Sequence, residues 1–318
     1  MRRLLVPLAL FIMILSACGS GSAPAPTAGP VTLKLAVIPV IDTLPMFVAQ
    51  AEGLYVKHGV NAELIPVASA PERDQLLQAG QADGTLNEIL SVMFFNKEEV
   101  RMQAVRYGHM ASEGAGHFFI LASGQSGIRE VKDLKGVEIG ISQGTIIEYL
   151  SDRLLEAEGL AVAQIRYLAV PKISDRMSLL ASGELKAGVM PDPLAALAVQ
   201  QGSKIILDDT SNPKLGASVI SFRKEIIDRH PQAIKAFLAA IEEAVGRIND
   251  NPSKYSALLA EKKIVPRSLV SSYKFPKFPL SGAPTEAEWS DVLSWAKAKG
   301  LLTANSAFGD SVNSSFLP

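Results

Sequence analysis

Short apolar segments alternate with helical segments along most of this 318-residue chain, and this alternation constrains the fold more than any other feature of the sequence. An apolar run at 33–37 is followed by helical spacing at 45–52 and by a second apolar run at 62–66. Strands that alternate with helices form a mainly parallel sheet covered on both faces. We predict strands at 33–37, 62–66, 83–86, 101–107, 116–122, 137–141, 165–168, 187–190, 204–207 and 216–222. We predict helices at 45–52, 72–79, 87–95, 145–158, 174–181, 194–201, 231–249 and 286–299.

The alternation starts again half-way along the chain. The residues LLQAG at 76–80 correspond to LLASG at 179–183, and each glycine is followed by a short strand, a polar turn and a helix. This order predicts an α/β fold of two related lobes, joined by two hinge strands around a central cleft. We predict lobe 1 at 31–120, lobe 2 at 121–215, and a return strand with C-terminal helices packing mainly on lobe 1 at 216–318.

Composition excludes several classes of function. The chain has 31 basic and 32 acidic residues with no basic stripe, so nucleic acid is not an expected partner. Four scattered histidines and a single cysteine leave no metal-ligand spacing and no intramolecular disulfide. A hydrophobic content of 48% and a charged content of 20% are typical of a folded globule.

The N-terminus has the pattern of a secretory signal. Arg2 and Arg3 precede twelve mostly apolar residues at 4–15, which is far short of the roughly 20 residues that span a bilayer. The residues LSAC at 15–18 resemble the lipobox of bacterial lipoproteins, which implies a signal peptide at 1–17 and a lipidated Cys18. Residues 18–30 then form a flexible tether rich in Gly, Ser and Pro. We therefore expect a lipid anchor on the extracytoplasmic face of the cell membrane; the alternative is an ordinary secretory leader with a chance cysteine.

Over roughly residues 31–260, a series of short motifs occurs in the same order as in a known protein family. They are LPMFVAQ at 44–50, EGLY at 52–55, HGV at 58–60, GQADG at 80–84, DLKG at 133–136 with IG at 139–140, GT at 144–145, GVMPDP at 188–193, and HP at 230–231 before a long helix. With them the chain resembles extracytoplasmic substrate-binding proteins of ABC importers, which have the type II periplasmic-binding fold. The branch that it resembles contains sulfonate-, nitrate- and thiamine-pyrimidine-binding proteins.

Two departures bear on the ligand. Pyrimidine binders of this branch carry a tryptophan and a histidine in the first strand-to-helix loop, whereas residues 37–45 contain neither, and Thr43 stands near the histidine position. Fungal relatives that form pyrimidines have a cysteine-rich motif, and this chain has no cysteine after Cys18. Both departures favour another solute and a protein that is not an enzyme.

Candidate ligand residues follow the predicted strands, because ligands of open α/β sheets bind beyond the carboxyl ends of strands, where helices begin. Asn87, Thr145 and Asp192 are alternatively helix caps, and Met46 and Tyr107 are alternatively core residues. The loops hold no arginine, which favours a neutral polar ring system over a small strong anion. The candidate ligand-binding residues are Asp42, Thr43, Met46, Asn87, Glu88, Tyr107, Gly144, Thr145 and Asp192.

The resemblance predicts a lipid-anchored, monomeric binding protein that needs no cofactor and delivers a small solute to an ABC permease and its ATPase subunit. From overall likeness to the riboflavin-binding component of bacterial importers, riboflavin is the favoured solute, with Tyr107 for stacking and Asp42 or Asp192 as acceptors. Alkanesulfonate- or nitrate-type anions and a thiamine pyrimidine precursor are the alternatives. A ligand sensor or an enzyme of pyrimidine synthesis is a further alternative, although the sequence contains no catalytic constellation.

Overall fold

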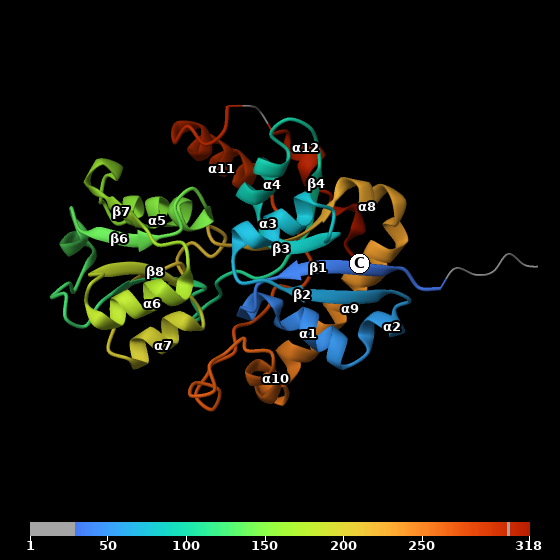
Figure 1. Cartoon of the computed structure of the whole chain (residues 1–318), viewed down its shortest axis with the longest axis horizontal. Coiled ribbons are helices and arrows are strands. Elements are labelled where there is room, and N and C mark those ends of the chain that lie inside the picture. The colour runs from blue at the N-terminus through green and yellow to red at the C-terminus, as the bar shows by residue number, and fades with distance from the viewer. Residues whose placement is uncertain (1–28, 304–305) are drawn as a thin grey trace, which may run out of the picture.

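The structure, a computed structural model, describes residues 29–303 and 306–318 and contains two five-stranded sheets. The predicted signal peptide, Cys18 and the tether up to residue 28 lie outside the described residues. Figure 1 shows the two sheets side by side, each with its own helices. We call the sheet that contains β1, with its helices, lobe 1, and the sheet that contains β6, with its helices, lobe 2.

The sheet of lobe 1 has the order β2-β1-β3-β10-β4. Strand β1 pairs in parallel with β2 and β3, whereas β10 pairs antiparallel with both β3 and β4. Four strands therefore run in one direction, and the strand that comes last in sequence runs in the other. The strands are β1 (Thr32–Val37), β2 (Asn61–Pro66), β3 (Gly84–Glu88), β4 (Met102–Tyr107) and β10 (Ser218–Arg223).

The sheet of lobe 2 repeats this arrangement with the order β7-β6-β8-β5-β9. Strand β6 is parallel to β7 and β8, and β5 is antiparallel to β8 and β9. The first strand after the crossing from lobe 1 thus occupies the position that β10 has in the other sheet. The predicted two-lobed α/β fold is confirmed. The strands are β5 (Phe118–Ala122), β6 (Glu138–Ile141), β7 (Arg166–Ala169), β8 (Ala187–Pro191) and β9 (Lys204–Asp208).

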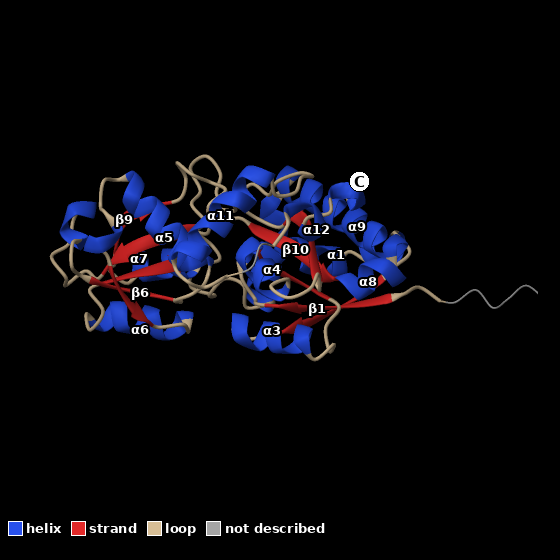
Figure 2. Ribbon diagram, turned by 90° about the horizontal axis from the view of Figure 1, so that it is seen from above, coloured by secondary structure: helices blue, strands red, loops and turns tan. Residues whose placement is uncertain are grey.

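Helices cover both faces of each sheet (Figure 2). The hydrophobic core of lobe 1 joins β1, β10, α1 and the 20-residue α9, whose apolar face is buried along its whole length. None of the described helices is long and apolar enough to cross a membrane. The α-helices of the first lobe's chain segment are α1 (Leu44–Ala51), α2 (Leu54–Lys57), α3 (Ala70–Gln78) and α4 (Ile89–Phe95). Those that follow are α5 (Ile146–Ala157), α6 (Ile173–Ser182), α7 (Leu194–Gln200), α8 (Lys224–Arg229), α9 (Pro231–Asp250), α10 (Ser256–Glu261), α11 (Glu286–Ala298) and α12 (Phe308–Ser311).

The chain crosses between the lobes at 108–117 and again at 209–217, just before β5 and β10. The predicted crossing strands therefore belong to the sheets, and the segments before them make the crossings. Among the C-terminal elements, α9 packs on α1 and α2, whereas α11 contacts both α4 of lobe 1 and α5 of lobe 2. Figure 1 shows α11 above the junction of the two lobes.

Candidate solute-binding cleft

A cleft of about 320 Å³ lies between the two lobes. Its walls come from the loop after β1, the loop before α3, the end of β3 with α4, the start of β5, and the loops before α5 and α6. Four helices thus begin at the cleft. The first N–H groups of a helix have no partner within the helix and carry its positive end, so this arrangement favours electron-rich groups of a ligand.

Much of the wall is apolar. Leu90 and Phe94 of α4 face the cleft from lobe 1, and Phe118, Ile146 and Ile147 face it from lobe 2. Mostly apolar walls with a few polar groups are typical of pockets for organic molecules.

Arg73 and Glu88 supply charge on the side of lobe 1. Arg73 is 2% exposed, its Nε donates to Asp74 Oδ1 at 2.8 Å, and its Nη2 lies 3.7 Å from Glu88 Oε2. Burial raises the pKa of Glu88, and the charge of Arg73 opposes this rise. The predicted loops hold no arginine, but Arg73, in the first turn of α3, lines the cleft.

Asp42 and His117 form a buried ion pair at the base of the cleft, with His117 Nε2 at 3.0 Å from Asp42 Oδ1. Burial alone would lower the pKa of His117, but the charge and hydrogen bond of Asp42 raise it to about 9. Burial would raise the pKa of Asp42, but His117 and, more weakly, His109 hold it well below its ordinary value. His109, with its ring centroid 4.8 Å from that of His117, has a pKa lowered to about 3 by burial and by the neighbouring positive charge.

On the side of lobe 2, the loop before α5 is held by its own side chains. Thr145 accepts a hydrogen bond from Ile147 N at 3.2 Å as the N-cap, and Gly144 N donates to Glu148 Oε2 at 2.7 Å. Behind the loop, the fully buried Arg176 donates through Nη1 to Ser142 Oγ at 2.8 Å. Burial lowers the pKa of Arg176 to about 10, so it stays cationic at neutral pH.

The cleft brings together four of the predicted residues, namely Asp42, Glu88, Gly144 and Thr145. Thr43 and Met46 do not line it. The hydroxyl of Thr43 donates to Val40 O at 2.7 Å, and Met46 is 1% exposed in the core beneath α1.

Asn87 and Tyr107 also lie outside the cleft. Asn87 is fully buried and accepts a hydrogen bond from Ser221 Oγ at 2.7 Å, within the sheet of lobe 1. Tyr107 donates to Glu288 Oε2 of α11 at 2.7 Å, in a separate pocket beneath α11. A stacking role for Tyr107 in the cleft was therefore wrong.

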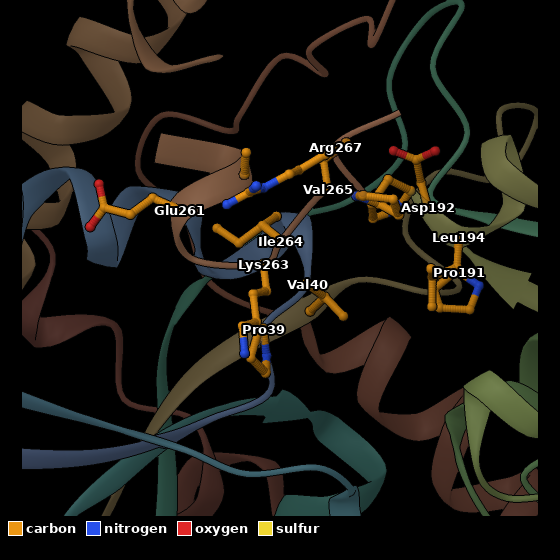
Figure 3. A pocket seen from close by; sticks show the side chains of 13 residues that line it. Pro39, Val40, Pro191, Asp192, Leu194, Glu261, Lys263, Ile264, Val265 and Arg267 are labelled. Carbon is orange, nitrogen blue, oxygen red and sulfur yellow. The ribbon is translucent and has the colours of Figure 1, made fainter. Parts of the chain in front are cut away.

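Asp192 lines a second pocket of about 410 Å³, which shares Val40 and Pro191 with the cleft. Figure 3 shows Pro39 and Val40 of lobe 1 facing Asp192 of lobe 2, with residues 261–267 forming the third wall. The carboxylate of Asp192 accepts a hydrogen bond from Tyr273 Oη, and burial raises its pKa to about 6. Asp192 is therefore not a wall residue of the cleft.

Arg73 and His117 are cleft residues that the sequence pattern did not predict. Arg73 lies four residues before Leu77, so both side chains lie on the same face of α3, and they are the two buried residues of that helix. This spacing was the sequence feature that indicated a buried position for Arg73. The signal for His117 was its position directly before an apolar strand at a crossing between lobes.

Residues 27–260 match the NMT1-like family. The chain belongs to this family. The NMT1-like chain is 24% identical over 211 residues to a protein of Brucella abortus (strain 2308) that is described as a binding protein. The alignment covers 65% of this chain and 63% of that relative. The chain therefore matches just under two thirds of the length of that relative. A protein of Escherichia coli (strain K12) described as an aliphatic sulfonates-binding protein is 26% identical over 53% of each chain.

Solved structures show the fold of the NMT1-like chain. The alkanesulfonate-binding protein of Xanthomonas axonopodis pv. citri, bound to MOPS, has a TM-score of 0.75 with 16% identity and covers 90% of this chain and 99% of its own. The periplasmic nitrate-binding protein of Synechocystis PCC 6803 has a TM-score of 0.69 with 14% identity, covering 90% and 87%. Both support the two-lobed periplasmic binding fold that the sheets display.

Proposed function

We propose that this chain is the solute-binding component of an ABC importer and that its solute is a small organic anion of the sulfonate type. The observation that carries the proposal is the cleft between the lobes, where α5 and α6 begin and where the cationic Arg176 lies directly behind Ser142. Helix N-termini and a buried guanidinium both favour an anionic group. Movement of the lobes about the crossings at 108–117 and 209–217 closes the protein on its solute.

The wall chemistry favours an organosulfonate over the other solutes. Leu90, Phe94 and Phe118 offer apolar contact that an alkyl or ring body fills and that nitrate, with no apolar part, does not. Riboflavin loses its predicted stacking contact and one of its two predicted acceptors, because Tyr107 and Asp192 do not line the cleft. The names of the relatives from Escherichia coli and Xanthomonas also favour sulfonates.

A second class of function finds less support. The chain is 22% identical over 281 residues to the 4-amino-5-hydroxymethyl-2-methylpyrimidine phosphate synthase of Schizosaccharomyces pombe. Its single cysteine, Cys18, precedes the family match and provides no cysteine-rich motif. We therefore favour binding over catalysis.

Calorimetric titration of the purified full-length protein tests the proposed function. We expect propanesulfonate to bind with a micromolar dissociation constant, about −8 kcal/mol, and nitrate and riboflavin to give no saturable heat. Circular dichroism verifies that the protein is folded. If folded protein binds none of the sulfonates offered, or binds riboflavin more tightly than any of them, the proposed solute class is wrong.

The membrane anchor is a separate part of the proposal and rests on the residues LSAC at 15–18. We expect the chain expressed in a bacterial host to incorporate labelled palmitate and to fractionate with membranes. Cys18→Ala removes the thiol that would carry the lipid, so its product is expected to carry no label. Equal labelling of both proteins would show that Cys18 is not the anchor.

A further inference from the structure

The carboxylate of Glu88 lacks a committed partner in the wall of lobe 1. Its side chain is 26% exposed to the cleft, and its contact with Arg73 is longer than an ordinary hydrogen bond. Its one cationic neighbour within 4 Å among the residues that the structure describes is Arg73, whose Nη2 lies 3.7 Å away. A partly desolvated carboxylate without a close hydrogen bond is costly, so the site favours a cationic or N–H donor opposite Glu88.

Arg73 meets this need only in part, because its nearest group lies 3.7 Å from Glu88 and two of its donors are bound elsewhere. Its Nε donates to Asp74 Oδ1 at 2.8 Å, and its Nη2 donates to Ser91 Oγ at 3.3 Å. Of the other two acidic groups of the wall, Asp74 accepts from Arg73 and Asp42 is paired with His117. Two cations thus face three carboxylates, and Glu88 carries the excess negative charge on the side of lobe 1.

The wall of lobe 2, in contrast, has a buried cation, Arg176, behind it. Arg176 donates to Ser142 Oγ and to Val170 O, and its Nε and Nη2 are buried with no partner among the described residues. No ion pair within the described ranges includes Arg176. The loops at 142–145 and 171–173, which lie in front of it, lead into α5 and α6. Glu148, in the first turn of α5, is paired with Lys299 at 3.0 Å, so the guanidinium of Arg176 gives this wall its positive charge.

We infer that the solute is a zwitterion, a sulfonate that also carries a cationic amino group, oriented with its anionic end against the loops before α5 and α6 and its amino group against Glu88. This inference rests on the proposed function. The apolar spacer between the two charges lies along Phe94 and Phe118. A cleft with charges of opposite sign on its two walls also requires the lobes to close before both ends of the solute are bound.

A matched pair of ligands tests the inference on the intact protein. Propanesulfonate and 3-aminopropanesulfonate differ only in the amino group. We expect the amino compound to bind about 10- to 100-fold more tightly, the range given by one hydrogen bond to a charged partner. Acetylation to 3-acetamidopropanesulfonate removes the positive charge and is expected to abolish this advantage. This comparison needs no variant, so folding does not affect it.

Glu88→Gln provides the complementary test. The variant is expected to reduce the preference for 3-aminopropanesulfonate over propanesulfonate by about tenfold or more. The matched control is Glu63→Gln on β2 of the same lobe, whose exposed carboxylate lies 4.0 Å from Lys34 and away from the cleft. The control is expected to bind both ligands like the parent protein.

The outcomes distinguish failure of the proposed function from failure of the zwitterion inference. Failure of both sulfonates to bind folded protein would overturn the proposed function. Equal binding of propanesulfonate and 3-aminopropanesulfonate, with no selective loss in Glu88→Gln, would overturn the inference of a zwitterion and leave an importer of simple sulfonates. Tighter binding of the amino compound, lost in Glu88→Gln alone, supports the inference.

Discussion

Asp42→Asn is expected to lower the free energy of unfolding by about 3–5 kcal/mol, the usual cost of breaking a buried ion pair by removing one partner. Asp42 and His117 are 4% and 3% exposed, and their charged atoms lie 3.0 Å apart. The substitution leaves the imidazolium of His117 buried without its counter-charge. Urea unfolding at pH 6 measures the loss from the shift of the midpoint at constant slope.

The pH dependence of this loss follows from the two pKa shifts. The pKa of His117 in the folded protein is about 9, above its ordinary 6.5, so its contribution is present below pH 6.5 and is lost as the pH rises through 9. The pKa of Asp42 is depressed below its ordinary 3.8, so its contribution is present above that value and is lost as the pH falls. We therefore expect the difference between the parent and Asp42→Asn to be largest between about pH 4 and 6.5.

Two variants control this prediction. Glu63→Gln removes a carboxylate of an exposed pair, and its effect is expected to stay below about 1 kcal/mol. The double variant Asp42→Asn with His117→Gln removes both charges and is expected to be more stable than Asp42→Asn alone. If Asp42→Asn costs no more than Glu63→Gln, the pair does not contribute as the geometry implies.

The same pair connects the cleft to both crossings between the lobes. The backbone N–H groups of His117 and Phe118, at the end of the first crossing, donate to Asp209 Oδ1 at 2.8 and 3.1 Å. Asp209 begins the second crossing, directly after β9. Asp42 belongs to lobe 1. Its ion pair with His117 therefore links lobe 1 to the crossing segments about which lobe 2 moves.

The alternation of strands and helices was enough to predict the architecture. Each predicted strand overlaps a strand of the structure, because an apolar run of four to six residues between polar turns has few other ways to be buried. The correspondence between 76–80 and 179–183 predicted two related lobes, and the two sheets do share one topology. Short elements such as α8 and α12 have no comparable period and were not predicted.

The site was predictable only in part, because the sequence does not say which side chains at the end of a strand face the cleft. Leu86 and Glu88 line the cleft and Asn87 does not, because successive side chains of a strand point to opposite faces. Tyr107 was misplaced for a different reason. Strand β10, more than 100 residues later in sequence, lies between β3 and β4, which moves the end of β4 away from the cleft and under α11.

Asp152→Ala is expected to cost about 3–5 kcal/mol of stability and to loosen α11 from lobe 2. Asp152 of α5 is fully buried and accepts hydrogen bonds from Tyr167 Oη at 2.7 Å and Trp295 Nε1 at 2.8 Å. Its Oδ2 also lies 2.8 Å from Lys299 Nζ, just after α11. Removal of this carboxylate leaves buried donors without an acceptor, which costs more than the loss of a hydrogen bond exposed to water.

The two tryptophans of the chain, Trp289 and Trp295, both lie in α11, so their fluorescence reports on this helix. In Asp152→Ala we expect the fluorescence transition to precede the loss of far-ultraviolet circular dichroism, whereas the two coincide in the parent. Asp291→Ala is the matched control at the same α5–α11 interface, because its carboxylate is 45% exposed and its pair with Arg153 is expected to contribute less than about 1 kcal/mol. Coincident transitions in Asp152→Ala would mean that α11 unfolds with the lobes. Separate transitions would show that α11, which contacts both α4 and α5, unfolds as a cooperative unit of its own.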